Sequence, residues 1–218
     1  MLPHMSVLKA LAAVVVISLF AGGVAMAADL TVSVADQDGM PVENAVVTLT
    51  SADAVAVKPA SPAPRIIDQQ RETFLPLVTI VPRGGQIVFT NNDQTRHHVY
   101  SFSQIKKFDL VLNPGEKSSP VIFDLEGVAT IGCNIHDGMI AYAFVAASPF
   151  NGLTGADGRA AIVKLTAGNY IARLWHPRTK PGAQPAEQQI AVGATATAIE
   201  FTVPLMAERP HSSHHRSY

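Results

Sequence analysis

The amino-acid sequence predicts an all-β fold built of two β-sandwiches. Short runs of β-branched and aromatic residues recur along the chain, and turn residues separate them. We find no amphipathic helix after the N-terminal segment. Apolar residues make up 48% of the 218 residues and charged residues 15%, which is typical of a globular chain and excludes a disordered one. Many short strands with frequent turns favour sandwiches.

The first 27 residues have the pattern of a cleaved signal peptide. An apolar run from Ala10 to Val24 follows Lys9, and Ala25-Met26-Ala27 supplies the small residues that signal peptidase requires. A membrane anchor is the alternative, but a spanning helix needs about 20 apolar residues. We therefore expect a protein exported to the periplasm, with no stable membrane span after cleavage.

Twelve segments have the composition of strands. Turn residues lie between several of them, as at Asp38-Gly39 and Asn113-Pro114-Gly115. The expected strands are Leu30–Val34, Ala45–Thr50, Gln86–Thr90, His97–Phe102, Phe108–Leu112, Val121–Phe123, Val128–Ile131, Ile140–Ala146, Ala160–Leu165, Tyr170–Trp175, Gln188–Val192 and Ala198–Val203.

Two segments lack a strand pattern. Lys58 to Pro64 is rich in Pro and small residues, which predicts an extended, exposed linker. The tail from residue 206 to residue 218 is polar, and we expect a solvated, frayed terminus. Metal capture by its histidines is the alternative reading: His211, His214 and His215.

Charge excludes one class of partner. The formal net charge is −1, whereas a nucleic-acid-binding protein needs clustered Lys and Arg. The acidic residues near strand ends are not arranged by any motif as a general acid and base, so we expect a solvated surface and no enzyme activity from them. They are Asp68, Glu72, Asp109, Glu116, Asp124 and Glu126.

The residues with distinctive chemistry gather in the loop from Cys133 to Met139, which also contains His136. Cys133 is the only cysteine, so it has no disulfide partner in its own chain. A thiolate, an imidazole and a thioether together form a soft donor set that suits copper, whereas a thioether contributes little to zinc. His97, at the start of an expected strand, supplies a distant ligand. Two His, one Cys and a weak axial Met make a blue-copper site.

Other interpretations of this set stay open. Cys133 is also compatible with a buried small hydrophobe, an intermolecular disulfide or a nucleophile with His97 as its base. The nucleophile leaves His136 and Met139 unexplained. His98 is the alternative to His97, and because successive strand residues point to opposite faces, only one of the two imidazoles binds.

Residues Gln86 to Ala146 resemble the cupredoxins, most closely plastocyanin and amicyanin. The resemblance lies in Asn91-Asn92, the following His, and the short Cys-x-x-His-x-x-Met spacing. It implies a Greek-key sandwich that binds one copper ion, cycles it between Cu(II) and Cu(I), and passes electrons between transient redox-protein partners. The ligands it implies are His97, Cys133, His136 and Met139.

The chain departs from that family in two places around the ligands. His98 stands where Asn is usual, and Ala129–Gly132, directly before Cys133, include no aromatic residue. Both changes affect the groups that orient the ligands. A copper-handling protein that stores or delivers the ion, and a non-redox binding module on a degenerate cupredoxin scaffold, are the alternative functions.

Most of the mature chain is also similar to exported proteins labelled methylamine utilization proteins. The similarity lies in Asp68-Gln69, Phe74, His97–Ser103, Gly132–Asp137 and Trp175-His176-Pro177. We expect His176 to be a turn or surface residue rather than a ligand.

The flanking segments are similar to carboxypeptidase regulatory-like, transthyretin-related sandwiches. Val34–Leu49 looks like the opening hairpin of that module, and Thr154–Arg159 and Leu165–Tyr170 look like its continuation. The cupredoxin portion is then inserted between strands of the second sandwich, and two sequential domains are the alternative. The expected boundaries are 1–27 signal peptide, 28–52 first strands, 53–66 linker, 67–148 cupredoxin, 149–205 remainder and 206–218 tail.

Overall fold

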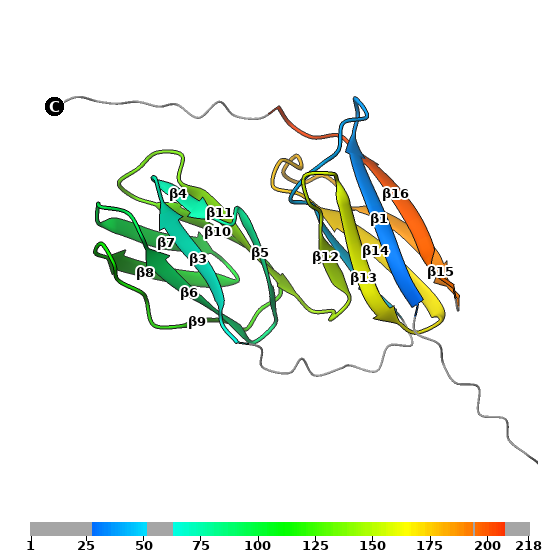
Figure 1. The fold of residues 1–218 in the computed structure, drawn as a ribbon, viewed down its shortest axis with the longest axis horizontal. Coiled ribbons are helices and arrows are strands. Elements are labelled where there is room, and N and C mark those ends of the chain that lie inside the picture. The colour runs from blue at the N-terminus through cyan, green and yellow to red at the C-terminus, as the bar shows by residue number, and fades with distance from the viewer. Residues whose placement is uncertain (1–27, 52–62, 194, 208–218) are drawn as a thin grey trace, which may run out of the picture.

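The computed structural model describes residues 28–51, 63–193 and 195–207. These residues form strands and loops, arranged as two sandwiches side by side (Figure 1). No helix in these ranges is long and apolar enough to cross a membrane. The predicted signal peptide, most of the predicted linker, and the histidines of the tail lie outside the described residues.

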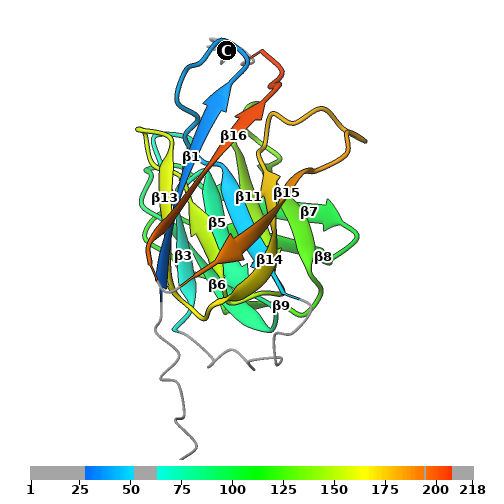
Figure 2. The same ribbon diagram turned by 90° about the vertical axis from the view of Figure 1, so that its right-hand side faces the viewer.

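One sandwich, here called the split sandwich, takes strands from both ends of the described chain. Its strands are β1 (Ala28–Asp36), β2 (Val46–Thr50), β12 (Asn151–Leu153), β13 (Arg159–Leu165), β14 (Gly168–Trp175), β15 (Ala186–Val192) and β16 (Thr197–Val203). The sheet order is β13-β1-β16 in one layer and β12-β2-β14-β15 in the other. β1 pairs antiparallel with β13 and parallel with β16, which runs beside it in Figure 2.

The inserted sandwich lies between β2 and β12 in the chain. Its strands are β3 (Arg65–Gln70), β4 (Thr73–Leu75), β5 (Val78–Pro82), β6 (Gly85–Asn91), β7 (His97–Ser103), β8 (Lys106–Leu112), β9 (Val121–Phe123), β10 (Gly127–Cys133) and β11 (Ile140–Ala146). The order is β5-β11-β10-β7-β8 in one sheet and β4-β3-β6-β9 in the other. Alternating apolar residues of both sheets fill a core separate from that of the split sandwich.

The chain returns to the split sandwich through buried hydrogen bonds. Asn151 of β12 is paired with Thr48 of β2. The Thr154 hydroxyl accepts the Ala45 amide and donates to the Val42 carbonyl. The prediction of an all-β fold with two sandwiches is therefore confirmed.

Aromatic stacking joins the two sandwiches. The Trp175 ring, at the end of β14, lies 5.7 Å from the Tyr142 ring and 5.5 Å from the Phe144 ring of β11, between ring centroids. Both contacts have the tilted or edge geometry that aromatic pairs prefer.

Four described strands were not predicted: β3, β4, β5 and β12. β3 begins at Arg65, inside the predicted linker range, and it carries Asp68, Gln69 and Gln70. Its polar composition hides its strand period, because the polar side chains are used in hydrogen bonds of the site. β4 and β12 have three residues each, too few to show a period.

His176 begins the turn after β14, where the Thr179 amide donates to its carbonyl at 3.0 Å, so it is a turn residue as expected, but it is buried, at 6% exposure, and not on the surface. Its Nε2 lies 3.0 Å from the Glu43 carbonyl and its Nδ1 accepts the Arg178 amide at 3.1 Å. Burial lowers the pKa of His176, the Glu43 contact opposes this, and the charge of Arg178 lowers it further. This histidine therefore closes the β14–β15 loop as a neutral imidazole.

Candidate metal centre

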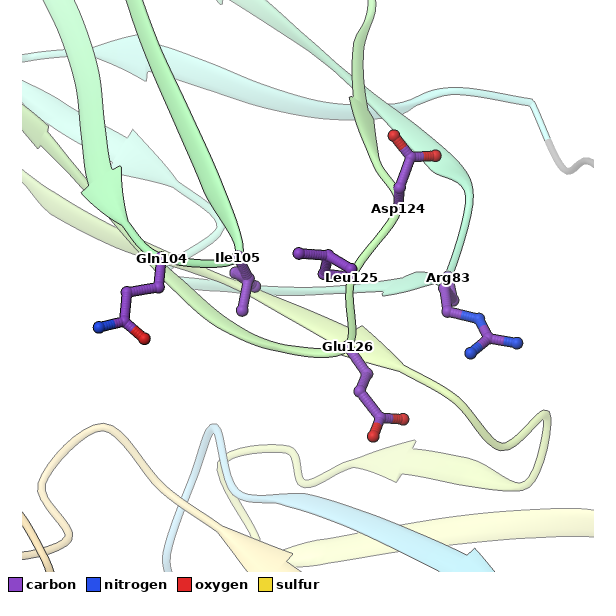
Figure 3. A pocket seen from close by; sticks show the side chains of 6 residues that line it. All are labelled: Arg83, Gln104, Ile105, Asp124, Leu125 and Glu126. Carbon is purple, nitrogen blue, oxygen red and sulfur yellow. The ribbon is translucent and has the colours of Figure 1, made fainter.

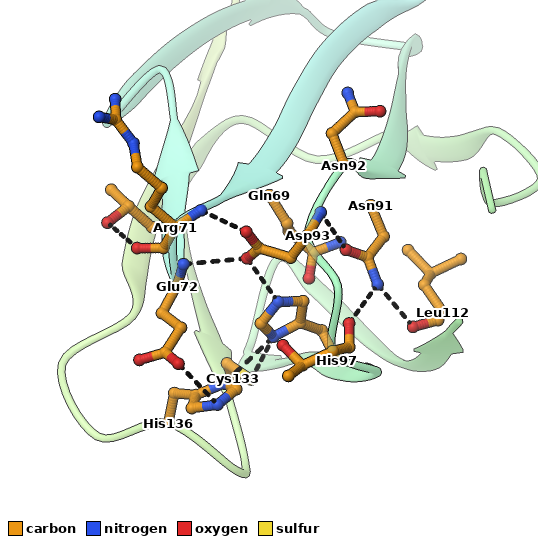
Figure 4. A network of polar contacts seen from close by, with 12 residues as sticks. Gln69, Arg71, Glu72, Asn91, Asn92, Asp93, His97, Leu112, Cys133 and His136 are labelled. Carbon is orange, nitrogen blue, oxygen red and sulfur yellow. Dashed lines mark hydrogen bonds and ion pairs between the residues drawn. The ribbon is translucent and has the colours of Figure 1, made fainter. Parts of the chain in front are cut away.

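Three metal-binding side chains converge at one end of the inserted sandwich (Figure 4). The Cys133 Sγ lies 3.7 Å from His97 Nδ1 and 3.9 Å from His136 Nδ1, and the two Nδ1 atoms are 3.2 Å apart. Strand pairing produces this arrangement, because Cys133 at the end of β10 pairs with Val99 near the start of β7. His136 follows three residues later on the loop to β11.

The spacing of these three atoms fits a metal ion. A triangle with those edges has a circumscribed radius of about 2.1 Å, so one point is equidistant from both nitrogens and the sulfur at that distance. Bonds from imidazole nitrogen and thiolate sulfur to zinc are about 2.0 and 2.3 Å long and set the scale for the neighbouring metals. The spacing of the three donor atoms therefore suits one shared ion.

The loop that carries His136 and Met139 is tied to Cys133 by its backbone. The Cys133 amide donates to the Met139 carbonyl at 3.3 Å, and the Met139 amide donates to the His136 carbonyl at 3.4 Å. Gly138 has φ +90°, a conformation that L side chains rarely adopt, and it makes this tight turn possible. The Met139 side chain is 5% exposed and packs in the core of the inserted sandwich.

The site is closed on one side and open on the other. His97 is fully buried and Cys133 is 8% exposed, whereas the side chain of His136 is 22% exposed. His136 is therefore the member of the cluster with the most contact with solvent.

Asp93 holds the outer nitrogen of His97. Its Oδ2 lies 2.8 Å from His97 Nε2, and its carboxylate accepts the backbone amides of Arg71 and Glu72. Burial raises the pKa of Asp93, but the hydrogen bonds from Glu72, His97 and Arg71 lower it more, so the net shift is downward. An ionised Asp93 accepts a hydrogen bond from Nε2–H, which leaves Nδ1 without a proton and facing Cys133.

Glu72 lies beside the other imidazole. Its Oε1 is 3.6 Å from His136 Nε2, and its side chain is 59% exposed. The sequence grouped Glu72 with scattered surface acids, and its exposure agrees, but its contact with the site was not predicted. No local pattern signals it, because the β3–β4 turn reaches the cluster only in the folded chain.

The Asn91-Asn92 pair shapes the loop before His97. The buried Asn91 amide group donates to the carbonyls of Thr95 and Leu112, and its side-chain oxygen accepts the Asp93 amide. Asn92 donates to both carboxylate oxygens of Asp68 on β3. The pair thus fixes Asp93 and, through it, His97.

The structure separates the two adjacent histidines. His98 points away from the cluster, and its Nε2 lies 2.7 Å from Oδ1 of Asp109 on β8. Successive residues of a strand point to opposite faces, so His97 lies on the other face of β7 from His98. His97 is the histidine that joins Cys133 and His136.

An aromatic side chain covers the backbone ahead of Cys133, although Ala129–Gly132, directly before it, include no aromatic residue. Tyr100 of β7 is paired with Gly132 of β10, and a Cβ added at Gly132 would lie 3.1 Å from the Tyr100 ring. A glycine at this position lets the ring lie directly on the strand next to the thiolate residue.

A second concave region lies at the other end of β10. It is an open recess of about 560 Å³ at the turns that follow β5, β7 and β9, as Figure 3 shows. Glu126 immediately precedes β10 and Cys133 ends it, so the length of the strand separates the recess from the cluster. The recess is lined by Arg83, Gln104, Ile105, Asp124, Leu125 and Glu126.

Comparison with known proteins gives structural matches only. No family model and no curated protein matches the chain. A "Cu-containing nitrite reductase" from Thermus scotoductus is 25% identical, with a TM-score of 0.37, over 43% of this chain and 24% of that one, so the chain spans about a quarter of that enzyme. Amicyanin from Paracoccus versutus is 17% identical, with a TM-score of 0.36, over 46% of this chain and 97% of that one.

A "Novel Purple Cupredoxin" from Nitrosopumilus maritimus is 25% identical, with a TM-score of 0.32, over 37% of this chain and 96% of that one. All three matches cover less than half of this chain. The function proposed below is argued from the side chains of the site.

Proposed function

We propose that this protein is an exported copper protein that carries single electrons between redox partners. One observation carries the proposal: His97 Nδ1, His136 Nδ1 and Cys133 Sγ are spaced so that one point lies about 2.1 Å from all three. Two imidazoles and a thiolate are the ligand set of blue-copper sites. Met139, buried on the same loop, would be the weak fourth ligand of that ion.

Copper in this site supplies a one-electron change between Cu(II) and Cu(I). The residues of the chain do the rest. Asp93 and Glu72 lie at the outer nitrogens of the two imidazoles and keep the inner nitrogens available as ligands. The buried side of the cluster excludes water, and His136 links it to the surface, where a partner protein docks transiently.

The proposal includes the compartment and the absence of an enzymatic reaction. The pattern of residues 1–27 is that of a signal peptide. In an oxidising compartment cysteines are usually paired, so a single cysteine needs another role, and a metal site provides one. A nucleophilic role for Cys133 would leave the second imidazole, His136, without a function.

The visible absorption spectrum and cyclic voltammogram of the copper-loaded protein test this function. An intense thiolate-to-copper absorption that Cys133→Ser removes, together with a reversible one-electron wave, is the expected result. Rapid loss of Cu(I) to a chelator without a reversible wave would instead favour copper storage or delivery. A folded protein that stays colourless with Cu(II) would favour a non-redox binding module.

A further inference from the structure

The tip of the β3–β4 hairpin contacts His136 directly and is linked to His97 through Asp93. The Glu72 amide donates to Asp93 Oδ2 at 2.9 Å, and the same oxygen lies 2.8 Å from His97 Nε2. The Glu72 carboxylate faces the other imidazole, with Oε1 3.6 Å from His136 Nε2. Figure 4 shows these contacts extending from the turn to the two rings. One residue thus reaches His97 through its backbone and Asp93, and His136 through its side chain.

The backbone of this turn is held in an uncommon conformation. Arg71 and Glu72 both have φ of +54°, in the left-handed region. Glycine adopts this region readily, Asn and Asp adopt it occasionally, and other residues rarely do. Type I′ hairpin turns require positive φ at both central positions. Both amides donate to the Asp93 carboxylate, which offsets the conformational cost. These two hydrogen bonds therefore fix the backbone of Glu72, from which its side chain extends, relative to the cluster.

Fixing the backbone matters because the Glu72 side chain is exposed. An exposed carboxylate gains little from an ion pair in water, since ordering its side chain costs entropy and solvent screens its charge. The anchored turn removes part of that cost before the contact forms. Arg71, on the same turn, extends away from His136 in Figure 4, so its cation does not compete for the Glu72 carboxylate.

We infer that Glu72 is a positioning residue whose carboxylate attracts the Nε2 edge of the His136 ring, keeps Nδ1 directed at the metal, and favours Cu(II) over Cu(I) by its negative charge. This inference rests on the proposed copper function. Histidine ligands commonly donate their outer N–H to a carboxylate, which fixes the ring and strengthens its donor nitrogen. Cu(II) carries one more positive charge than Cu(I), so a nearby anion stabilises the oxidised form and lowers the reduction potential.

Two substitutions separate the polar contact from the charge. Glu72→Ala removes both, whereas Glu72→Gln keeps a polar oxygen at this position and removes only the charge. Glu126→Gln is the charge-matched control, because it removes one exposed carboxylate at the opposite end of β10. Copper affinity is measured by chelator competition, the reduction potential by voltammetry, and the His136 Nε2 proton by NMR of the metal-free full-length chain.

We expect Glu72→Ala to weaken copper binding about tenfold, the lower end of the range for lost carboxylate partners of histidine ligands, and Glu72→Gln to weaken it less. Both variants should raise the reduction potential more than Glu126→Gln does. The His136 Nε2 proton should exchange slowly in the wild type and rapidly in Glu72→Ala.

The inference is overturned if Glu72→Ala binds copper as tightly as the wild type. It is also overturned if the reduction potentials of both Glu72 variants match that of Glu126→Gln, or if the Nε2 proton exchanges equally fast in the wild type and in Glu72→Ala. A wild-type chain that binds no copper contradicts the proposed function and with it the effect of Glu72 on the metal. The contact between Glu72 and His136 is tested separately, because the proton exchange is measured without metal.

Discussion

The carboxylate of Asp93 holds the buried imidazole of His97, with Oδ2 2.8 Å from Nε2. The same carboxylate accepts two backbone amides from the β3–β4 turn. The site is therefore built from three separate segments of the inserted sandwich: the β3–β4 turn, the β6–β7 loop with the start of β7, and the end of β10 with the β10–β11 loop.

Asp93→Asn should weaken copper binding roughly 10- to 100-fold, because an amide is a poorer acceptor for the Nε2 proton than an ionised carboxylate. The control is Asp109→Asn, which changes the acidic partner of His98 instead of His97. Chelator competition compares the two variants. Equal copper affinities for Asp93→Asn and Asp109→Asn would show that Asp93 does not support the metal site.

The two adjacent histidines should respond differently to the same substitution. His97→Gln removes a nitrogen that lies 3.7 Å from Cys133 Sγ, so it should abolish the thiolate-to-copper absorption. His98→Gln changes a side chain on the other face of β7 and should preserve that absorption. Visible spectra of both copper-loaded variants make the comparison, and loss of the absorption in His98→Gln with retention in His97→Gln would reverse the assignment.

Met139→Leu should retain the thiolate-to-copper absorption and raise the reduction potential. The change nearly conserves volume at a buried position and removes a weak donor that favours the oxidised ion. Met40→Leu, at a position that is 61% exposed on the split sandwich, is the control. An unchanged potential in Met139→Leu, measured by voltammetry, would exclude Met139 as the axial ligand.

Gly158→Ala should destabilise the split sandwich by about 2 kcal/mol or more, because strain and close contact act together. Gly158 has φ +70°, and a Cβ there would lie 2.6 Å from the Val34 carbonyl oxygen. Gly39 has φ +80° with no atom near an added Cβ, so Gly39→Ala should cost only about 1 kcal/mol. Urea unfolding measures both, and equal free energies of unfolding would contradict the packing at Gly158.

Acid should destabilise the split sandwich through His176. Burial lowers the pKa of His176 below the ordinary value of 6.5, so the unfolded chain takes up a proton at a higher pH than the folded chain. The free energy of unfolding should therefore fall as the pH drops below about 6.5, until the folded-state pKa is reached. His176→Gln lacks this proton uptake and should show a weaker pH dependence in urea unfolding. An identical pH dependence in both proteins would contradict this account.

The sequence predicted the donor residues of the cluster because their spacing is local or follows from strand alternation. Cys133, His136 and Met139 lie within seven residues, and the placement of His97 follows from the preceding Asn-Asn loop. Asp93 and Glu72 were not predicted as parts of the site. Their roles depend on a hairpin turn that meets a loop about 20 residues later in the chain, and no periodicity or motif encodes that meeting.

The fold shows the same division between local and long-range information. Apolar strands such as β7, β10 and β11 were predicted with bounds close to those observed. The pairing of β1 with β16 joins residues at opposite ends of the described chain, and composition does not specify such a partner. The polar strand β3 was missed because Asp68 and Gln69 serve the loop that holds Asp93 rather than an apolar core pattern.

A crystal structure of the copper-loaded protein, with anomalous data collected at the copper absorption edge, tests the central claim most directly. The account predicts one anomalous peak bound by His97 Nδ1, Cys133 Sγ and His136 Nδ1, about 2.1 Å from each. A copper peak elsewhere in the chain, with these three atoms left unbound, would contradict it.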